Sequence, residues 1–232
     1  MKIKTIATAL GVTATLLASG SFAQEAKEYS PPSIENFGQF KKNGVEVMHY
    51  SAHTTDGFFA RAYVPADNLG WGQYFGDFSN QVHFWGQGIY GSGKVKWDLP
   101  SGMQQPDINL THYSIGAGIG AWQPVFESVD SKVKVAISGN IGVRLAYVDV
   151  DTEGGDFNRL LTGIPFDFGA HVTHADIPKL MLGFALLDPG IGHSHDDTRM
   201  GPFYASYQFT PKLKAVSYLG PTTSIGVEWG FN

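Results

Sequence analysis

The feature that most constrains the fold is a long alternation of side chains between Lys132 and Tyr147. Apolar residues occupy every odd position of this segment except Gly139, and the even positions are polar or small. A period of two describes a β-strand with one apolar and one polar face. Strands of soluble sandwiches run about five or six residues, whereas a tilted membrane-crossing strand needs about 9 to 11. The segment therefore predicts a strand of a transmembrane barrel.

The alternation inverts after Tyr147. Val148 and Val150 are apolar there, while Asp149 and Asp151 are charged. We expect either a β-bulge at this point or the exit of the strand from the membrane.

Weaker versions of the same pattern recur along the chain. Ile164 to Thr173 and Leu110 to Ala121 each place apolar side chains on one face and polar or small ones on the other. Further strands are expected at Leu180–Leu187, Phe203–Phe209, Leu213–Tyr218, Thr223–Phe231 and within Val82–Leu99, and an early hairpin at Val45–Thr54 and Phe58–Val64, turning through Thr55, Asp56 and Gly57. These segments predict an all-β fold, an antiparallel transmembrane β-barrel of 8 to 10 strands, with about ten if the early hairpin joins the wall.

The connections between these strands fall into two kinds when the C-terminus is placed on the periplasmic side. Short turns at Glu127–Ser131, His174–Pro178 and Thr210–Lys212 then share that side, and longer polar loops at Pro100–Asp107, Thr152–Gly163 and Asp188–Gly201 share the other. Outer-membrane barrels show this asymmetry, with short periplasmic turns and longer extracellular loops.

The first residues predict export. Residues 1–23 read as a secretory signal peptide, because Lys2 and Lys4 precede a short apolar run that ends in Ser21-Phe22-Ala23. We expect residues 24–43 to form an N-terminal periplasmic segment, either a short helix or a tether, and residues 44–232 to form the β-barrel domain. Loss of the two lysines moves the formal charge from -5 to -7, which disfavours a nucleic-acid partner. The absence of cysteine excludes disulfides and thiolate metal sites.

The last segment, Ser224 to Asn232, carries a more specific motif. Ser224, Gly226, Trp229 and Phe231 occupy the polar, glycine, hydrophobic and aromatic places of a pattern that resembles the assembly signal of outer-membrane barrels. Over its predicted mature length the chain is similar to the small outer-membrane barrels of the OmpA-like and OmpX-like group. The resemblance implies the cell outer membrane, recognition by the barrel-assembly machinery, contact with outer-membrane lipid and lipopolysaccharide, and a monomer.

The alternation also predicts which polar side chains face the lumen. The predicted inward set is Lys94, Lys96, His112, Ser114, Arg144, Asp167, His171 and Glu228, with Arg144 and His171 as partners of Glu228. Small barrels fill their interior with side chains, so we expect a polar plug. The alternative is a narrow pore whose selectivity these charges would tune.

Two motifs suggest chemistry. His112, Ser114 and the later Glu127 faintly resemble the His-x-Ser and Glu of lipid A 3-O-deacylases, but Ile115 follows the serine where that family has asparagine. The loop His193-Ser194-His195-Asp196-Asp197 could bind a divalent metal, although its spacing matches no defined site. We therefore expect no catalytic residue, cofactor site or metal site.

Aromatic residues are abundant, at 13% of the chain, and are expected to form girdles at the two membrane interfaces. Trp97, Trp122 and Trp229 lie near predicted strand ends, where such girdles occur. The favoured function is a non-enzymatic outer-membrane barrel that contributes to envelope integrity or surface interaction. A narrow porin-like channel is the first alternative, and a lipid A-modifying enzyme is the second.

Overall fold

The computed structural model describes residues 43–52, 55–95, 108–152, 155–188 and 200–231. They form eleven strands: β1 Asn43–Ser51, β2 Thr55–Pro65, β3 Val82–Val95, β4 Ile108–Glu127, β5 Val133–Thr152, β6 Phe157–Gly163, β7 Phe166–His174, β8 Leu180–Asp188, β9 Phe203–Thr210, β10 Leu213–Leu219 and β11 Thr223–Phe231. Three short 3-10 helices lie between β2 and β3: η2 Asp67–Leu69, η3 Gly72–Tyr74 and η4 Gly76–Gln81. None of the described helices is long and apolar enough to cross a membrane.

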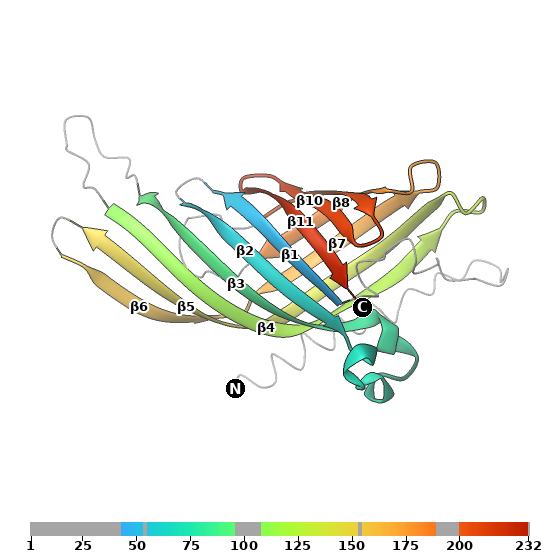
Figure 1. The fold of residues 1–232 in the computed structure, drawn as a ribbon, viewed down its shortest axis with the longest axis horizontal. Helices are drawn as coiled ribbons and strands as arrows, with labels where there is room; N and C mark the ends of the chain where they lie inside the picture. The colour runs from blue at the N-terminus through green and yellow to red at the C-terminus, as the bar shows by residue number, and fades with distance from the viewer. Residues whose placement is uncertain (1–42, 53–54, 96–107, 153–154, 189–199, 232) are drawn as a thin grey trace.

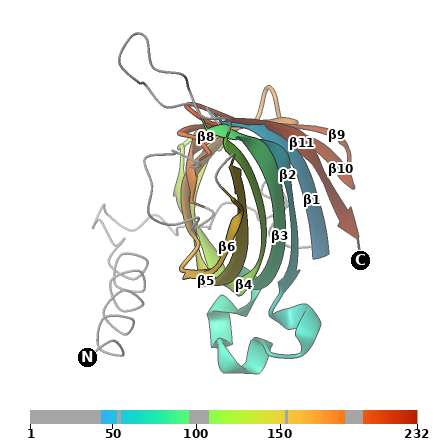
Figure 2. The same cartoon turned by 90° about the vertical axis from the view of Figure 1, so that its left-hand side faces the viewer.

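The sheet closes on itself (Figures 1 and 2). Each strand from β1 to β5 pairs with the next, β5 continues to β7, β7 to β11 pair in order, and β11 returns to β1. In the described part of the chain this ring has ten antiparallel strands, and β6 pairs with β5 beside it. The predicted all-β, antiparallel barrel is therefore confirmed at the upper end of the expected strand number, with the early hairpin in the wall.

A proline separates β6 from β7. The upper half of β5, Arg144 to Val150, pairs with β6, and its lower half, Val133 to Ile141, pairs with β7. Pro165 lies between the two short strands and has no N–H to donate to a ladder, although its carbonyl accepts a hydrogen bond from the Gly142 N–H at 3.1 Å. The expectation of a loop over residues 152–163 was wrong, because residues 157–163 of that range form strand β6.

One other local prediction needs correction, and one of two alternatives is excluded. Residues 55–57 were expected to turn the early hairpin, but they lie within β2, with Gly57 opposite Tyr50 and Asp56 opposite Ser51. No bulge follows Tyr147, because β5 pairs with β4 in unbroken register from Ala136 to Thr152. The irregularity in this pairing lies elsewhere, between Pro124 and Phe126 on β4. Pro124 cannot donate to the ladder, which accounts for an irregularity at that place.

The two faces of the wall have opposite character. Large apolar side chains project outward from nearly every strand, including Val47, Ile115, Val143, Phe168, Leu182 and Ile225, each at least 40% exposed. Polar and charged side chains are buried inside, among them Glu46, Arg61, His112, Arg144, Lys214 and Glu228. A barrel that is apolar outside and polar inside has the arrangement required in lipid, where closure also satisfies every edge group.

Glycines on the inner face make room for long side chains from neighbouring strands. Trp85 on β3 lies over Gly118 on β4 and Gly142 on β5, which share its cross-strand row. A Cβ at either glycine would come within 2.5 Å of the Trp85 ring. Part of the high glycine content is thus a packing requirement of the interior.

Trp122 belongs to this interior and not to an interfacial girdle. It is fully buried and forms part of an apolar cluster with Met48, Tyr50, Phe59 and Ala136. The prediction for Trp122 was wrong because β4 continues to Glu127, so residue 122 lies well inside the strand on its inward face. Trp229 is 60% exposed on the outer face, as expected of a girdle residue, and Trp97 lies outside the described residues.

The connections at the end where β11 finishes are of two kinds. The β4–β5, β7–β8 and β9–β10 connections are short turns, as predicted for the periplasmic side. The β2–β3 connection differs, because Ala66 to Gln81 folds into the three 3-10 helices and projects from the wall beside the start of β1 (Figure 1). The sequence pattern did not predict this segment.

Candidate functional site

A row of four charged side chains crosses the inner face of four adjacent strands. Arg61 on β2 is paired in register with Glu46 on β1, Glu46 with Glu228 on β11, and Glu228 with Lys214 on β10. All four are buried. Cations flank a central pair of carboxylates, so each acid has a basic neighbour in the row. The Lys214 Nζ donates to the Glu228 Oε1 at 2.8 Å.

Arg61 connects this row to the opposite wall. Its Nη1 lies 2.5 Å from the Asp167 Oδ2 on β7, and its Nη2 donates to the Gln87 Oε1 at 3.0 Å. The guanidinium also lies 5.1 Å from the Phe59 ring centre and 5.2 Å from the Trp85 ring. Charge-assisted hydrogen bonds and stacking together hold one guanidinium across the lumen.

A second chain of polar contacts joins β3, β5 and β7. The His83 ring Nε2 lies 2.6 Å from the Asn140 Oδ1, and the Asn140 amide donates to the Asp167 carboxylate. The Ser138 hydroxyl lies 3.0 Å from the His171 Nε2. Through Asp167 this chain meets Arg61, so both walls of the lumen are bridged by side chains.

The remaining space is small. The cavity bounded by these groups has a volume of about 80 Å³, and its lining includes Glu46, Arg61, His83, Asp167 and Glu228. A buried water requires roughly 10–15 Å³ on the same kind of measure, so the cavity has room for a few waters. The lumen around Arg61 and Asp167 is therefore largely filled by polar side chains.

Most of the predicted inward residues are confirmed in place. His112, Ser114, Arg144, His171 and Glu228 are buried on the inner face, and Asp167 lies in the polar network. The prediction for Lys94 was wrong: odd positions of β3 face inward, as buried His83 and Gln87 show, so Lys94 is exposed on the outer face. Lys96 lies outside the described residues.

The predicted partners of Glu228 were also wrong. Its ion-pair partner is Lys214 on the adjacent strand β10, whereas His171 bonds Ser138 and Arg144 lies beside Gly116 on β4. Facing direction follows from alternation, but partner identity depends on register between strands. Three central members of the network, Glu46, Arg61 and Lys214, were missed. Their signal was a lone charged residue within an otherwise apolar or small segment.

The deacylase-like residues are not brought together. The His112 Nε2 lies 2.9 Å from the Tyr50 hydroxyl, which occupies the nitrogen that would face a serine nucleophile. Glu127 ends the same strand and lies 3.6 Å from the Lys134 Nζ. Fifteen residues of extended strand separate it from His112, roughly 50 Å. His112, Ser114 and Glu127 therefore do not form an acid-oriented histidine–serine pair.

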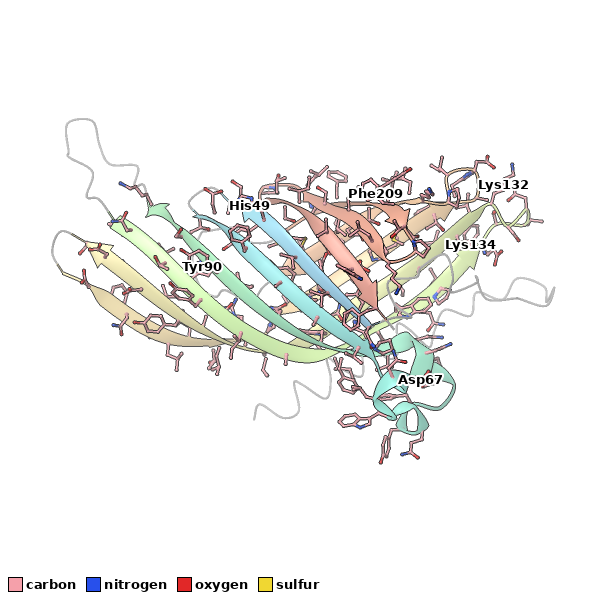
Figure 3. The ribbon with its side chains drawn as sticks, in the orientation of Figure 1. His49, Asp67, Tyr90, Lys132, Lys134 and Phe209 are labelled. Atoms are coloured by element: carbon pink, nitrogen blue, oxygen red, sulfur yellow. The ribbon has the colours of Figure 1, made fainter. Side chains whose placement is uncertain are left out.

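Strands β3 to β6 project beyond the closed part of the wall, and a row of tyrosines marks where their outer face changes. Tyr90, Tyr113 and Tyr147 lie side by side on β3, β4 and β5, and Figure 3 shows Tyr90 on the outer wall. Beyond this row the outer face carries polar residues, namely Ser92, Thr111, Asp149, Asn158, Asn109 and Asp151. Tyrosine belts with polar groups beyond them are typical of a membrane boundary.

The inner face of the projecting strands becomes more apolar beyond the same row. Beyond the row, Leu110, Val148, Val150 and Phe157 occupy inward positions, together with Arg159 opposite Val148; Phe157 is 56% exposed. The inversion after Tyr147 therefore coincides with the row at which both faces of the wall change character, and exit of the strand from the membrane stays the interpretation. We refer to β6 and the adjoining ends of β3, β4 and β5, beyond the tyrosine row, as the projecting sheet.

The possible metal loop, residues 193–197, lies outside the described residues. Within the described part of the chain, no three histidine, aspartate or glutamate side chains lie close enough to bind a metal ion.

Fold and interior together define a class: a closed antiparallel β-barrel, apolar outside and filled by polar side chains within. No family model and no curated protein matches the chain. Similar solved structures include Ail, the attachment invasion locus protein of Yersinia pestis, with 12% identity over 82% of this chain and 97% of that one and a TM-score of 0.31. Neisserial surface protein A has 20% identity over 82% and 96%, with a TM-score of 0.32.

The translocator domain of the autotransporter NalP from Neisseria meningitidis is also similar. It has 10% identity over 98% of each chain and a TM-score of 0.40. At these TM-scores the likenesses carry no inference about role.

Proposed function

We propose that the protein is an integral outer-membrane β-barrel that does not conduct solutes and has no catalytic role. It contributes to envelope integrity or to surface interaction through the projecting sheet and the extracellular loops. The observation that supports a lumen closed to solutes is the side-chain bridge from Glu46 and Arg61 through Asp167 to the facing wall. The cavity beside this bridge has a volume of about 80 Å³. The apolar outer belt and the tyrosine row support placement in a membrane.

Assembly and partners follow from the same proposal. Ser224, Gly226, Trp229 and Phe231 on β11 serve as the signal for the barrel-assembly machinery, and the mature protein is a monomer surrounded by outer-membrane lipid and lipopolysaccharide. The projecting sheet supports a role at the cell surface because its outer face is polar beyond Tyr147 and its strands extend past the length needed to cross the bilayer.

Planar-bilayer recording of the purified protein tests whether the lumen is closed to ions and small solutes. We expect no discrete openings above the noise of lipid alone. The variant Arg61→Ala removes the side chain that bridges the lumen, and Asn109→Ala, on the outer face of β4, is its matched control. Reproducible single-channel steps from the native protein would establish the channel alternative. Mass spectrometry of lipid A from cells with and without the protein tests the enzyme alternative, for which a lost acyl chain would be decisive.

Placement is tested by cysteine labelling, because the native chain has no cysteine. Asp151→Cys, in the projecting sheet, should react with a membrane-impermeant maleimide on intact cells. Lys212→Cys, in the β9–β10 turn, should react only after the outer membrane is permeabilised. Equal labelling of both in intact cells, or recovery of the protein in soluble periplasm, would refute the proposed placement.

A further inference from the structure

The β2–β3 connection, Ala66 to Gln81, exposes an unusual number of large apolar side chains. Leu69, Trp71, Tyr74 and Phe78 are 47%, 51%, 75% and 57% exposed. The charged residues of this stretch are Asp67 and Asp77, and it contains no lysine or arginine. We call it the aromatic insert. In water, such a concentration of exposed rings would be unfavourable.

The aromatic insert is attached to the outer wall of the barrel. The Trp71 ring meets the Phe84 ring edge to face, with centres 5.0 Å apart, and the Phe75 ring lies 6.3 Å from Phe84. Phe84 projects from β3 on the outward face, since its neighbours His83 and Trp85 are buried inside. The exposed rings are thus continuous with the lipid-facing belt and are not directed into the lumen.

The position of the insert fits the edge of that belt. It joins β2 to β3 at the end where β1 begins, and the Asn68 amide donates to the Asn43 side-chain oxygen at 3.1 Å. Figure 3 shows Asp67 on this segment, at the opposite end of the wall from Tyr90. The short turns that share this end contain no aromatic ring; they carry charged residues such as Asp130, Lys132 and Lys212, and they expose Val129 and Ile177. Tryptophan and tyrosine are enriched where bilayer headgroups meet the acyl chains.

We infer that the aromatic insert is an interfacial anchor that binds the phospholipid headgroup region of the leaflet at this end of the barrel, which is the periplasmic leaflet in the proposed orientation. The inference rests on the proposed membrane placement. Because the insert carries two acids and no base, its rings and not its charges make the contact, and binding is insensitive to the fraction of anionic lipid. It therefore adds a second point of attachment beyond the barrel wall.

Single cysteines carrying an environment-sensitive nitrobenzoxadiazole label test the anchor in vesicles of zwitterionic phospholipid. The test positions are Tyr74→Cys and Phe78→Cys. Val143→Cys on the outer belt is the lipid control, and Lys212→Cys in the β9–β10 turn is the water control. Heat-modifiable migration on a gel identifies the folded fraction of each variant.

Labels at 74 and 78 should emit at shorter wavelength than the label at 212, and lipid-soluble nitroxides should quench them several-fold more than iodide does. The same result is expected when part of the lipid is replaced by an anionic one. If positions 74 and 78 behave like 212 while 143 is lipid-exposed, the anchor is refuted and the barrel placement stands. If 143 also behaves like 212, the membrane placement itself is wrong.

Discussion

His83 on β3 and Asn140 on β5 are hydrogen-bonded at 2.6 Å although another strand lies between them. The intervening residue in their cross-strand row is Gly120 on β4. Because glycine has no side chain, the two polar groups meet above the β4 backbone. The contact links alternate strands of the wall, which a hydrogen-bonded sheet alone does not do.

Replacing Gly120 with alanine should destabilise the barrel. The new Cβ would lie 1.7 Å from the Asn140 Oδ1 and 2.5 Å from the His83 Nε2, so the hydrogen bond must open. Overpacking and loss of a buried hydrogen bond each cost about 1–3 kcal/mol. Urea unfolding in vesicles, followed by the gel shift of the folded form, measures the loss. Gly88→Ala is the control, since its Cβ would meet nothing nearer than 3.9 Å, and an equal loss in both variants would contradict the explanation.

The buried pair of Lys214 and Glu228 should be strongly coupled. Breaking a buried ion pair by removing one partner costs about 3–5 kcal/mol. Lys214→Met should be the worse single change, because it leaves Glu228 beside Glu46 with no lysine to compensate the two carboxylates. The double variant Lys214→Met with Glu228→Gln should lose less stability than the two single losses added together. Simple additivity in the same unfolding assay would show that the pair is not coupled.

An arginine on the outer belt should reveal contact with lipid. Val143 is 70% exposed and lies four residues, about 13 Å of strand, from the boundary residue Tyr147. In a bilayer, Val143→Arg should cost about 2–4 kcal/mol. Asn109→Arg, on the outer face beyond the tyrosine row, should stay within about 0.5 kcal/mol, the range for water-exposed surfaces. Two near-neutral substitutions would indicate that Val143 faces water.

The β4–β5 turn should make a pH-dependent contribution to stability. The Ser128 hydroxyl donates to the Asp130 Oδ1 at 2.6 Å and the Lys132 N–H donates at 3.2 Å, and these hydrogen bonds lower the pKa of Asp130. A carboxylate with a depressed folded-state pKa stabilises the fold above its unfolded pKa, and this stabilisation is lost as the pH falls through the folded pKa. Asp130→Ala should therefore be less stable than the native protein at neutral pH and converge with it in acid. A difference that persists unchanged to low pH would exclude this origin.

Much of the wall was predictable from side-chain alternation. The segment Lys132 to Tyr147 indicated a long two-faced strand, and β5 extends over Val133–Thr152 with the predicted facing. Inward residues such as His112 and Arg144 followed from the same rule, because successive side chains of a strand point to opposite faces.

Alternation within a strand does not specify the register between strands or the closure of the barrel. Lys214 meets Glu228 because β10 and β11 pair in one particular alignment, which neither segment encodes by itself. Arg61 reaches Asp167 because closure brings β2 and β7 to opposite sides of a narrow lumen. The aromatic insert has no periodic pattern, so its contact with Phe84 could not be read from spacing.

The glycines beneath Trp85 and between His83 and Asn140 have a consequence for how the barrel can change. If β4 slid by one residue, Gly118 and Gly120 would turn outward and larger neighbours would fill the interior, so the indole and the imidazole would both collide with them. Each such contact therefore disfavours a register shift among three strands at once. Mispaired or partly closed forms would lose these contacts together, which favours one alignment of the finished wall.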